Sequence, residues 1–282
     1  MGLELETLRP MGYVESSPGF AGLDGPYAAV SAPAGMPAAV FQRTGAIKDQ
    51  AQLSSCVGVS FATALRDRLT LQGSEPCDFS GLWIYAGARI QGAARRGRSR
   101  ETALMFDDGS SPEDAAAWLV AYGYVAEQWW PYNGLASDEP PIEALRHAWD
   151  QRGRMKQHRL DTPDEIRRAL ANGLTVTVAG PVDGAYLRYA GGVWPGNAGS
   201  IAGNHQRRIV GYCANGDFIE AGSWGTEYGI SYAEASGGSA PEHDAPGGFV
   251  RVSADAYDDA LEMHAIDWVA NPSEQNPLNG GA

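Results

Sequence analysis

The segment that most constrains the fold runs from Ile47 to Phe61 and joins a polar loop to an apolar helix-like run. Gln50 lies in the loop, and Cys56 comes six residues later, where the apolar run begins. A helix N-terminus presents unpaired N–H groups and a partial positive charge, which favour a thiolate over a thiol. A side-chain amide beside the sulfur can stabilise an oxyanion. The segment therefore fits either a thiol nucleophile or one more buried cysteine.

A second signal lies about 150 residues downstream, on two strand-like runs joined by Asn215-Gly216. Asn-Gly between such runs predicts a hairpin with positive φ at both turn residues. His205 stands at the start of the first run, and Ser223-Trp224-Gly225 closes the second. A lone histidine is more often structural than catalytic. A cysteine at a helix start with a distant histidine is nevertheless an order that thiol proteases use.

Together these motifs resemble the papain-like cysteine peptidases, in the disulfide-poor form found in bacteria and their viruses. The resemblance runs from about Met36 to about Val269. Its anchors are Asp49-Gln50-Ala51-Gln52 with Ser55-Cys56, the Asp107-Asp108-Gly109 loop, Trp130-Pro131-Tyr132, His205 with Val210-Gly211-Tyr212, and Ser223-Trp224-Gly225.

The resemblance implies an α+β, papain-like two-lobed fold, with a helical lobe, an antiparallel β-sheet lobe and the cleft between them. It implies Cys56 as the nucleophile, His205 as its base and Gln50 as the oxyanion donor. The residues that we expect to bind substrate along the cleft are Asp108, Gly109, Ser110 and Asn204.

The chain departs from the family pattern at Gly222, where an asparagine usually orients the imidazole. Glu220 lies two residues earlier, on the same face of a regular strand, and is one candidate replacement; a water is another. Arg207 and Arg208 stand where the family has small apolar residues. Because a buried unpaired arginine is costly, we expect at least one of them to reach a carboxylate or solvent. Leu53 stands where the family has a disulfide cysteine.

Composition narrows the function classes. The 282 residues are 44% hydrophobic and carry a net charge of −13, which argues against nucleic acid or anionic membrane as a partner. Three cysteines leave at most one disulfide beside a nucleophile, which favours a reducing compartment. No ligand pattern suggests a metal, so we expect no cofactor. No apolar run approaches the roughly 20 residues that span a bilayer.

The chain divides into an extended N-terminal arm at 1–35, a peptidase domain at 36–270 and a tail at 271–282. Within the domain we expect the helical lobe at about 50–140 and the β lobe at about 155–270. The arm lacks the features of a signal peptide, which favours the cytoplasm or the inside of a viral or bacterial particle. It is too short and too weakly helical for an inhibitory prodomain, so we expect no zymogen processing. It is a candidate contact for assembly partners.

The local patterns predict further elements. Helices are expected at 56–71, 79–90, from the Ser111 cap to Gly123, at about 141–152, and from the Thr162 cap to Gly173. Strands are expected at 174–179, 207–213, 217–222 and 248–252. The segment 227–247 is expected to be an inserted surface loop with an exposed His243, and His264 is expected to be structural.

Two functions of different classes remain open at this stage. The first is a thiol peptidase that cuts peptide or protein substrates through an acyl-enzyme, with a transpeptidase or amidase as a related reading. The second is a papain fold retained as a structural part of a larger assembly, such as a phage virion, with activity weak or lost. Gly222, the pair Arg207-Arg208, the absence of a recognisable prodomain and the long terminal arms favour the second function. The intact Gln50, Cys56 and His205 favour the first.

Overall fold

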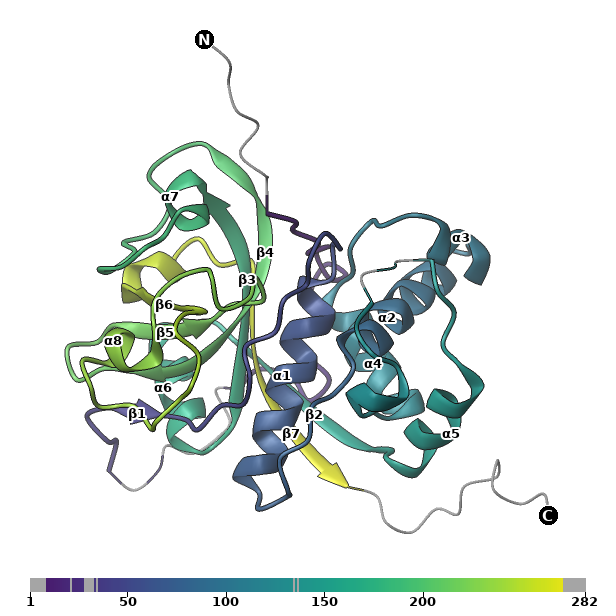
Figure 1. The fold of residues 1–282 in the computed structure, drawn as a ribbon, viewed down its shortest axis with the longest axis horizontal. Helices are drawn as coiled ribbons and strands as arrows, with labels where there is room; N and C mark the ends of the chain where they lie inside the picture. The colour runs from purple at the N-terminus through teal and green to yellow at the C-terminus, as the bar shows by residue number, and fades with distance from the viewer. Residues whose placement is uncertain are drawn as a thin grey trace.

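A computed structural model describes residues 9–20, 22–27, 33, 35–133, 135 and 137–270, so the expected tail at 271–282 lies outside the described residues. Helices α2, α3, α4 and α5 gather on one side of the molecule, most of the sheet lies on the other side with α6, α7 and α8, and α1 lies between the two (Figure 1). The strands follow the order β2-β7-β3-β4-β5-β6, and β1 pairs with β4. Each of these strand pairs is antiparallel.

The helices are α1 (Cys56–Leu71), α2 (Gly81–Arg95), α3 (Arg100–Met105), α4 (Pro112–Tyr122), α5 (Ile142–Asp150), α6 (Pro163–Ala171), α7 (Gly184–Leu187) and α8 (Tyr232–Ser236), with 3-10 turns at Glu127–Trp129 and Ala254–Tyr257. The strands are β1 (Val40–Phe41), β2 (Gly153–Leu160), β3 (Thr175–Asp183), β4 (Ile201–Tyr212), β5 (Phe218–Ala221), β6 (Phe249–Val252) and β7 (Glu262–Ala270).

Local capping signals fix several helix ends. The predicted helix over 56–71 is confirmed by α1. Ser111 accepts a hydrogen bond from the Asp114 N–H at the start of α4, and Gly123, with φ 81°, ends that helix as predicted. Thr162 caps α6 in the same way. Helix α3 was not predicted, because its short sequence carries no apolar periodicity.

The strands confirm the expected hairpin but correct two of its details. Strand β4 begins at Ile201, so His205 lies inside the strand rather than at its start. The turn after β4 closes when the Cys213 N–H donates to the Asp217 oxygen at 2.8 Å. Gly216 has a φ of 95°, but Asn215 is not among the described residues with positive φ, so the expected turn type is wrong.

The segment 227–247 is not a surface loop throughout. It contains α8, and Tyr228 and Tyr232 are buried in the core of the sheet lobe. Ile230 forms a bridge with Phe249 of β6. His243 is half-buried, with Nε2 3.0 Å from the Gly45 oxygen, so the expectation of an exposed side chain is wrong. The small and polar residues of the segment led to the prediction of a surface loop, but its tyrosines bury apolar area in the core.

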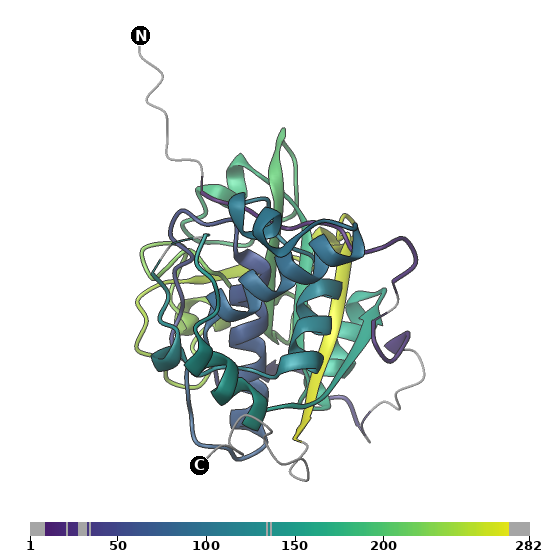
Figure 2. The same ribbon diagram turned by 90° about the vertical axis from the view of Figure 1, so that its right-hand side faces the viewer.

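Two apolar cores lie on opposite faces of the sheet. Along β7, Met263 and Ala265 belong to the core of the sheet lobe, whereas Ile266 and Trp268 belong to the core shared with the helices. Helix α1 packs against α2 on one side and against β3, β4 and β7 on the other (Figures 1 and 2). This packing brings the N-terminus of α1 to strand β4.

Candidate active site

Cys56 is the first residue of α1, and its side chain is fully buried. The N–H of Gln206 on β4 donates to its sulfur at 3.5 Å. Burial raises the pKa of Cys56 to about 11, although backbone N–H groups of Gln206, Gly12 and Val57 oppose the rise by stabilising a thiolate. In this arrangement the sulfur is therefore a neutral thiol at physiological pH.

His205 precedes Gln206 on β4, so the Gln206 contact brings the backbone of His205 close to Cys56. The ring is buried and stacks on Trp224, with 4.1 Å between ring centroids and an interplanar angle of 16°. Among the described residues neither ring nitrogen has a hydrogen-bond partner. Burial, and then the charge of Arg207, hold the pKa of His205 well below its usual value. The stacking fixes the plane of the ring. It does not determine which ring nitrogen carries the proton, because neither nitrogen has a hydrogen bond among the described residues.

Glu220 has contacts other than the imidazole. Its two carboxylate oxygens accept hydrogen bonds from Tyr186 at 2.8 Å and Tyr257 at 3.0 Å. Arg207 lies 3.6 Å from the same carboxylate. No described contact joins Glu220 to His205, so the geometry argues against Glu220 as the orienting group. Its carboxylate instead balances the buried charge of Arg207.

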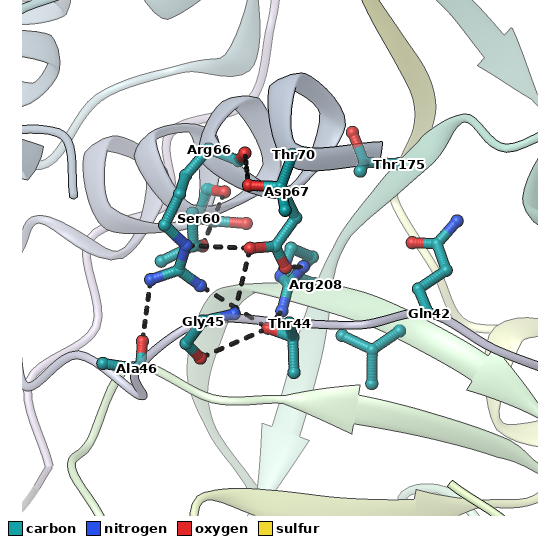
Figure 3. A network of polar contacts seen from close by, with 12 residues as sticks. Gln42, Thr44, Gly45, Ala46, Ser60, Arg66, Asp67, Thr70, Thr175 and Arg208 are labelled. Carbon is teal, nitrogen blue, oxygen red and sulfur yellow. Dashed lines mark hydrogen bonds and ion pairs between the residues drawn. The ribbon is translucent and has the colours of Figure 1, made fainter. Parts of the chain in front are cut away.

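Both unusual arginines reach carboxylates, as expected. Arg207 pairs with Glu220, and Arg208 pairs with Asp67 of α1 (Figure 3). Arg66 also donates to Asp67, at 2.8 Å. Arg208 therefore joins the sheet to α1, whereas Arg207 pairs within the sheet, with Glu220 of β5.

The Gln50 side chain is held in one orientation. Its Oε1 accepts from the Ser223 hydroxyl at 2.5 Å, which turns the Nε2 group the other way. Nε2 donates to the Leu53 oxygen at 2.8 Å and to the Pro10 oxygen at 3.1 Å. Ala51, which follows, has a φ of 49°, and no other described non-glycine residue has positive φ. Backbone strain of this kind concentrates at functional sites.

The described part of the N-terminal arm passes between strand β4 and the start of α1 (Figure 1). The Pro10 oxygen accepts from Gln50 and also from the Trp224 Nε1, at 3.1 Å in each case. The Gly12 N–H lies near enough to the Cys56 sulfur to lower the pKa of the thiol, against the effect of burial. The arm therefore lies over the candidate nucleophile. That the protein needs no zymogen processing stays a prediction.

Two of the four expected substrate-binding residues contact the arm. The Ser110 N–H donates to the Gly12 oxygen at 2.8 Å, and the Val14 N–H donates to the Ser110 oxygen at 2.9 Å. Gly109 has a φ of 80°, and a Cβ there would lie 2.2 Å from the Gly12 oxygen, so only glycine fits beside the arm. Asp108 and Asn204 are exposed.

The described residues contain no group of three or more His, Cys, Asp or Glu side chains that could hold a metal ion. Cys56, Cys77 and Cys213 are free thiols in this structure. Within the described part of the chain, no helix is both long and apolar enough to cross a membrane.

Residues 37–239, which are more than half of the chain, match the family model of the papain family cysteine proteases. The chain therefore belongs to the papain family of cysteine proteases. No curated protein matches the chain.

Solved structures show the same fold. Xylellain, a cysteine protease from Xylella fastidiosa, aligns with a TM-score of 0.73 and 17% identity over 95% of this chain and 100% of that chain. Digestive procathepsin L 3 from the larval midgut of Tenebrio molitor aligns with a TM-score of 0.64 and 18% identity, over 92% of this chain and 76% of that chain. Procathepsin B S9 from Trypanosoma congolense aligns with a TM-score of 0.65 and 15% identity, over 94% and 88%. The predicted α+β papain-like fold is confirmed.

Proposed function

We propose that the chain is a thiol peptidase that hydrolyses peptide bonds through an acyl-enzyme, with Cys56, His205 and Gln50 as its catalytic residues. The observation that supports this proposal is their convergence: a cysteine at a helix N-terminus, a histidine on the adjacent strand, and an amide held toward the same region. Family membership supports a cysteine peptidase independently of that geometry.

In this mechanism His205 accepts the thiol proton of Cys56, and the sulfur bonds to the carbonyl carbon of the substrate. The Gln50 Nε2 and the Cys56 backbone N–H stabilise the oxyanion that forms. His205 then gives its proton to the leaving amine, so the thioester forms as the peptide bond breaks. A water, deprotonated by His205, hydrolyses the thioester and restores the thiol.

The proposed enzyme is latent while the arm occupies the cleft. The Pro10 oxygen accepts the hydrogen bond from Gln50 that an oxyanion would need, and Gly12 covers the sulfur. The raised pKa of Cys56 and the lowered pKa of His205 both disfavour the charged thiolate–imidazolium pair in this covered state. Displacement of the arm would admit water and substrate together.

The experiment uses a substitution that the cleft cannot accommodate. A Cβ added at Gly12 would lie 1.7 Å from the Ser54 backbone oxygen, so Gly12→Ala must displace the arm. We expect the full-length Gly12→Ala protein to be labelled at Cys56 by an epoxide- or vinyl-sulfone-type thiol probe at neutral pH, and to cleave casein. Gly199→Ala is the matched control, because Gly199 has no positive φ and a Cβ there would lie 3.6 Å from the Asp183 carboxylate, which is ordinary contact.

Cys56→Ala must abolish labelling and cleavage, and His205→Ala must abolish cleavage. If Gly12→Ala folds and displaces the arm, yet neither reacts with the probe nor cleaves casein, the structural-component function would replace the peptidase.

A further inference from the structure

We infer that Glu262 is a specificity-determining residue, and that the pocket now filled by Tyr13 selects a tyrosine side chain in a bound peptide. This inference rests on the proposed function, because it names the substrate class of that same cleft. It follows from how the arm occupies the site.

The arm shows where a peptide backbone binds. Both backbone groups of Ser110 bond to the arm: its N–H donates to the Gly12 oxygen, and its oxygen accepts from the Val14 N–H. Tyr13 therefore lies opposite Ser110 in a parallel bridge. A peptide running the other way would exchange both hydrogen bonds with Ser110 through a single residue. In either direction one residue lies opposite Ser110, next to the one that meets the Cys56 sulfur.

The side chain of that residue enters a closed pocket. Tyr13 is 9% exposed and packs within the core shared with α1 and α2. Its hydroxyl donates to Glu262 Oε1 at 2.5 Å, and the Ser16 N–H donates to the same oxygen at 2.8 Å. Glu262 is 3% exposed, and its Oε2 has no hydrogen-bond donor among the described residues. A buried carboxylate without a donor is costly, so an occupant lacking a hydroxyl leaves Glu262 poorly paired.

The surrounding charges favour a neutral donor over a cation. Burial, and then the hydrogen bond to Glu262, raise the pKa of Tyr13, so its hydroxyl stays protonated and donates. His264 lies 3.7 Å from Glu262, but burial lowers the pKa of His264 to about 3 and leaves the ring neutral. Arg159 lines the same cavity of about 360 Å³ as Glu262 and already supplies a positive charge there.

Asp161 pairs with Arg159 at 3.5 Å, and Glu15 of the arm also lines this cavity. Neither carboxylate fully neutralises the charge of Arg159. Asp161 is largely exposed to solvent, and Glu15 belongs to the arm, so it is lost from the cavity when a substrate replaces the arm. A lysine would therefore have to shed its water to reach a carboxylate that already has a cation nearby, whereas a tyrosine hydroxyl loses less.

The test measures binding without chemistry. The full-length chain carrying Cys56→Ala, Gly12→Ala and Tyr13→Ala leaves the pocket empty. It is titrated by calorimetry with the arm's own peptide, Arg-Pro-Met-Gly-Tyr-Val-Glu-Ser-Ser, and with its tyrosine-to-phenylalanine and tyrosine-to-lysine versions. We expect the tyrosine peptide to bind on the order of tenfold more tightly than either of the other two, because only its hydroxyl donates a hydrogen bond to the Glu262 carboxylate at low desolvation cost.

Glu262→Leu in this background should abolish the difference between the tyrosine and phenylalanine peptides, and Glu262→Gln, which keeps the shape of the side chain, should reduce it. Asp161→Asn, which alters the cavity but not the carboxylate that Tyr13 contacts, should preserve it. Equal binding of the tyrosine and phenylalanine peptides, tightest binding of the lysine peptide, or a preference that survives both Glu262 substitutions would overturn the inference.

Probe labelling separates this inference from the proposed function. A tyrosine preference in binding without any Cys56 labelling in the Gly12→Ala chain would sustain the pocket and reject the peptidase. Labelling of Cys56 by tyrosine- and phenylalanine-containing vinyl sulfones at equal rates would sustain the peptidase and reject the role of Glu262.

Discussion

At the scale of single residues, Cys56 and His205 lie on segments that meet at the Gln206 contact, and both side chains favour their neutral forms. The cause is the same for each, since the arm and the two lobes exclude water from both side chains. A thiol becomes nucleophilic only as its thiolate, so the exclusion of water controls reactivity at this site.

Alkylation of Cys56 by iodoacetamide should therefore depend on pH in a way that reports arm position. Because burial raises the pKa of Cys56 to about 11, the full-length chain should react slowly at pH 7 and with a rate midpoint near pH 11. In Gly12→Ala the midpoint should fall to about 8.5 or lower, the range of solvated thiols. Peptide mapping separates Cys56 from the exposed Cys77. Identical midpoints in the two chains would contradict this.

A side chain at Gly222 should raise turnover by selecting the tautomer of His205. A Cβ there would lie 3.6 Å from the Gly248 oxygen, which is ordinary contact, and the Gly222 φ is outside the positive region. We expect Gly222→Asn to increase kcat on the order of tenfold in the Gly12→Ala background with little change in KM, as for an orienting group. Gly222→Ala supplies the same Cβ without the amide and should change nothing. An unchanged kcat in a folded Gly222→Asn protein would reject an orienting role for that position.

At the scale of elements, the contacts of the arm suit an inhibitor better than a substrate. The arm group near the sulfur is the Gly12 N–H, which lowers the pKa of Cys56, whereas the Pro10 carbonyl accepts hydrogen bonds from Gln50 and Trp224. No described hydrogen bond joins that carbonyl to the Cys56 N–H, which is the second donor an oxyanion needs.

The arm should consequently resist cleavage by its own chain. Full-length protein held at neutral pH should show no Cys56-dependent cut within residues 9–17 by intact-mass measurement. Slow cuts that accelerate with protein concentration are compatible with this, because another molecule makes them. Cleavage within 9–17 at a rate independent of concentration, absent in Cys56→Ala, would show that the arm binds as a substrate.

Elements with local signals were predictable from the sequence, and long-range placements were not. Helix α1 follows from its apolar run, and α4 from Ser111 and Gly123, which act within a turn of the helix. The arm is held instead by contacts such as that of Tyr13 with Glu262, which are 249 residues apart and carry no local pattern. The contact between the start of α1 and β4, which carry Cys56 and His205, was predicted only through the family resemblance, because it joins elements far apart in the sequence.

At the scale of the whole molecule, a buried charge network joins the two lobes behind the site (Figure 3). Asp67 of α1 pairs with Arg208 of β4 and with Arg66, and it accepts from the Gly45 N–H at 3.2 Å. Arg66 extends the network to Asp78 at 3.0 Å. Burial by itself would raise the pKa of Asp67, but the charges of Arg208 and Arg66 outweigh burial and hold that pKa below its usual value.

Loss of the Asp67 charge should therefore destabilise the junction of the lobes. Asp67→Asn leaves Arg208 buried without its carboxylate, and we expect the free energy of unfolding to fall by about 3–5 kcal/mol at pH 7. Glu139→Gln, which breaks the exposed pair with Arg100, should cost no more than about 1 kcal/mol. Urea unfolding followed by circular dichroism measures both.

The same pair of variants has a defined pH signature. Since the folded pKa of Asp67 is lowered, its contribution is fully present above the unfolded value of about 3.9 and is lost as pH falls through the folded value. The stability gap between the native chain and Asp67→Asn should stay constant from about pH 7 to pH 5 and shrink below about pH 4. A gap that is small at pH 7, or that widens as the solution is acidified, would show that Asp67 does not hold the lobes together through its charge.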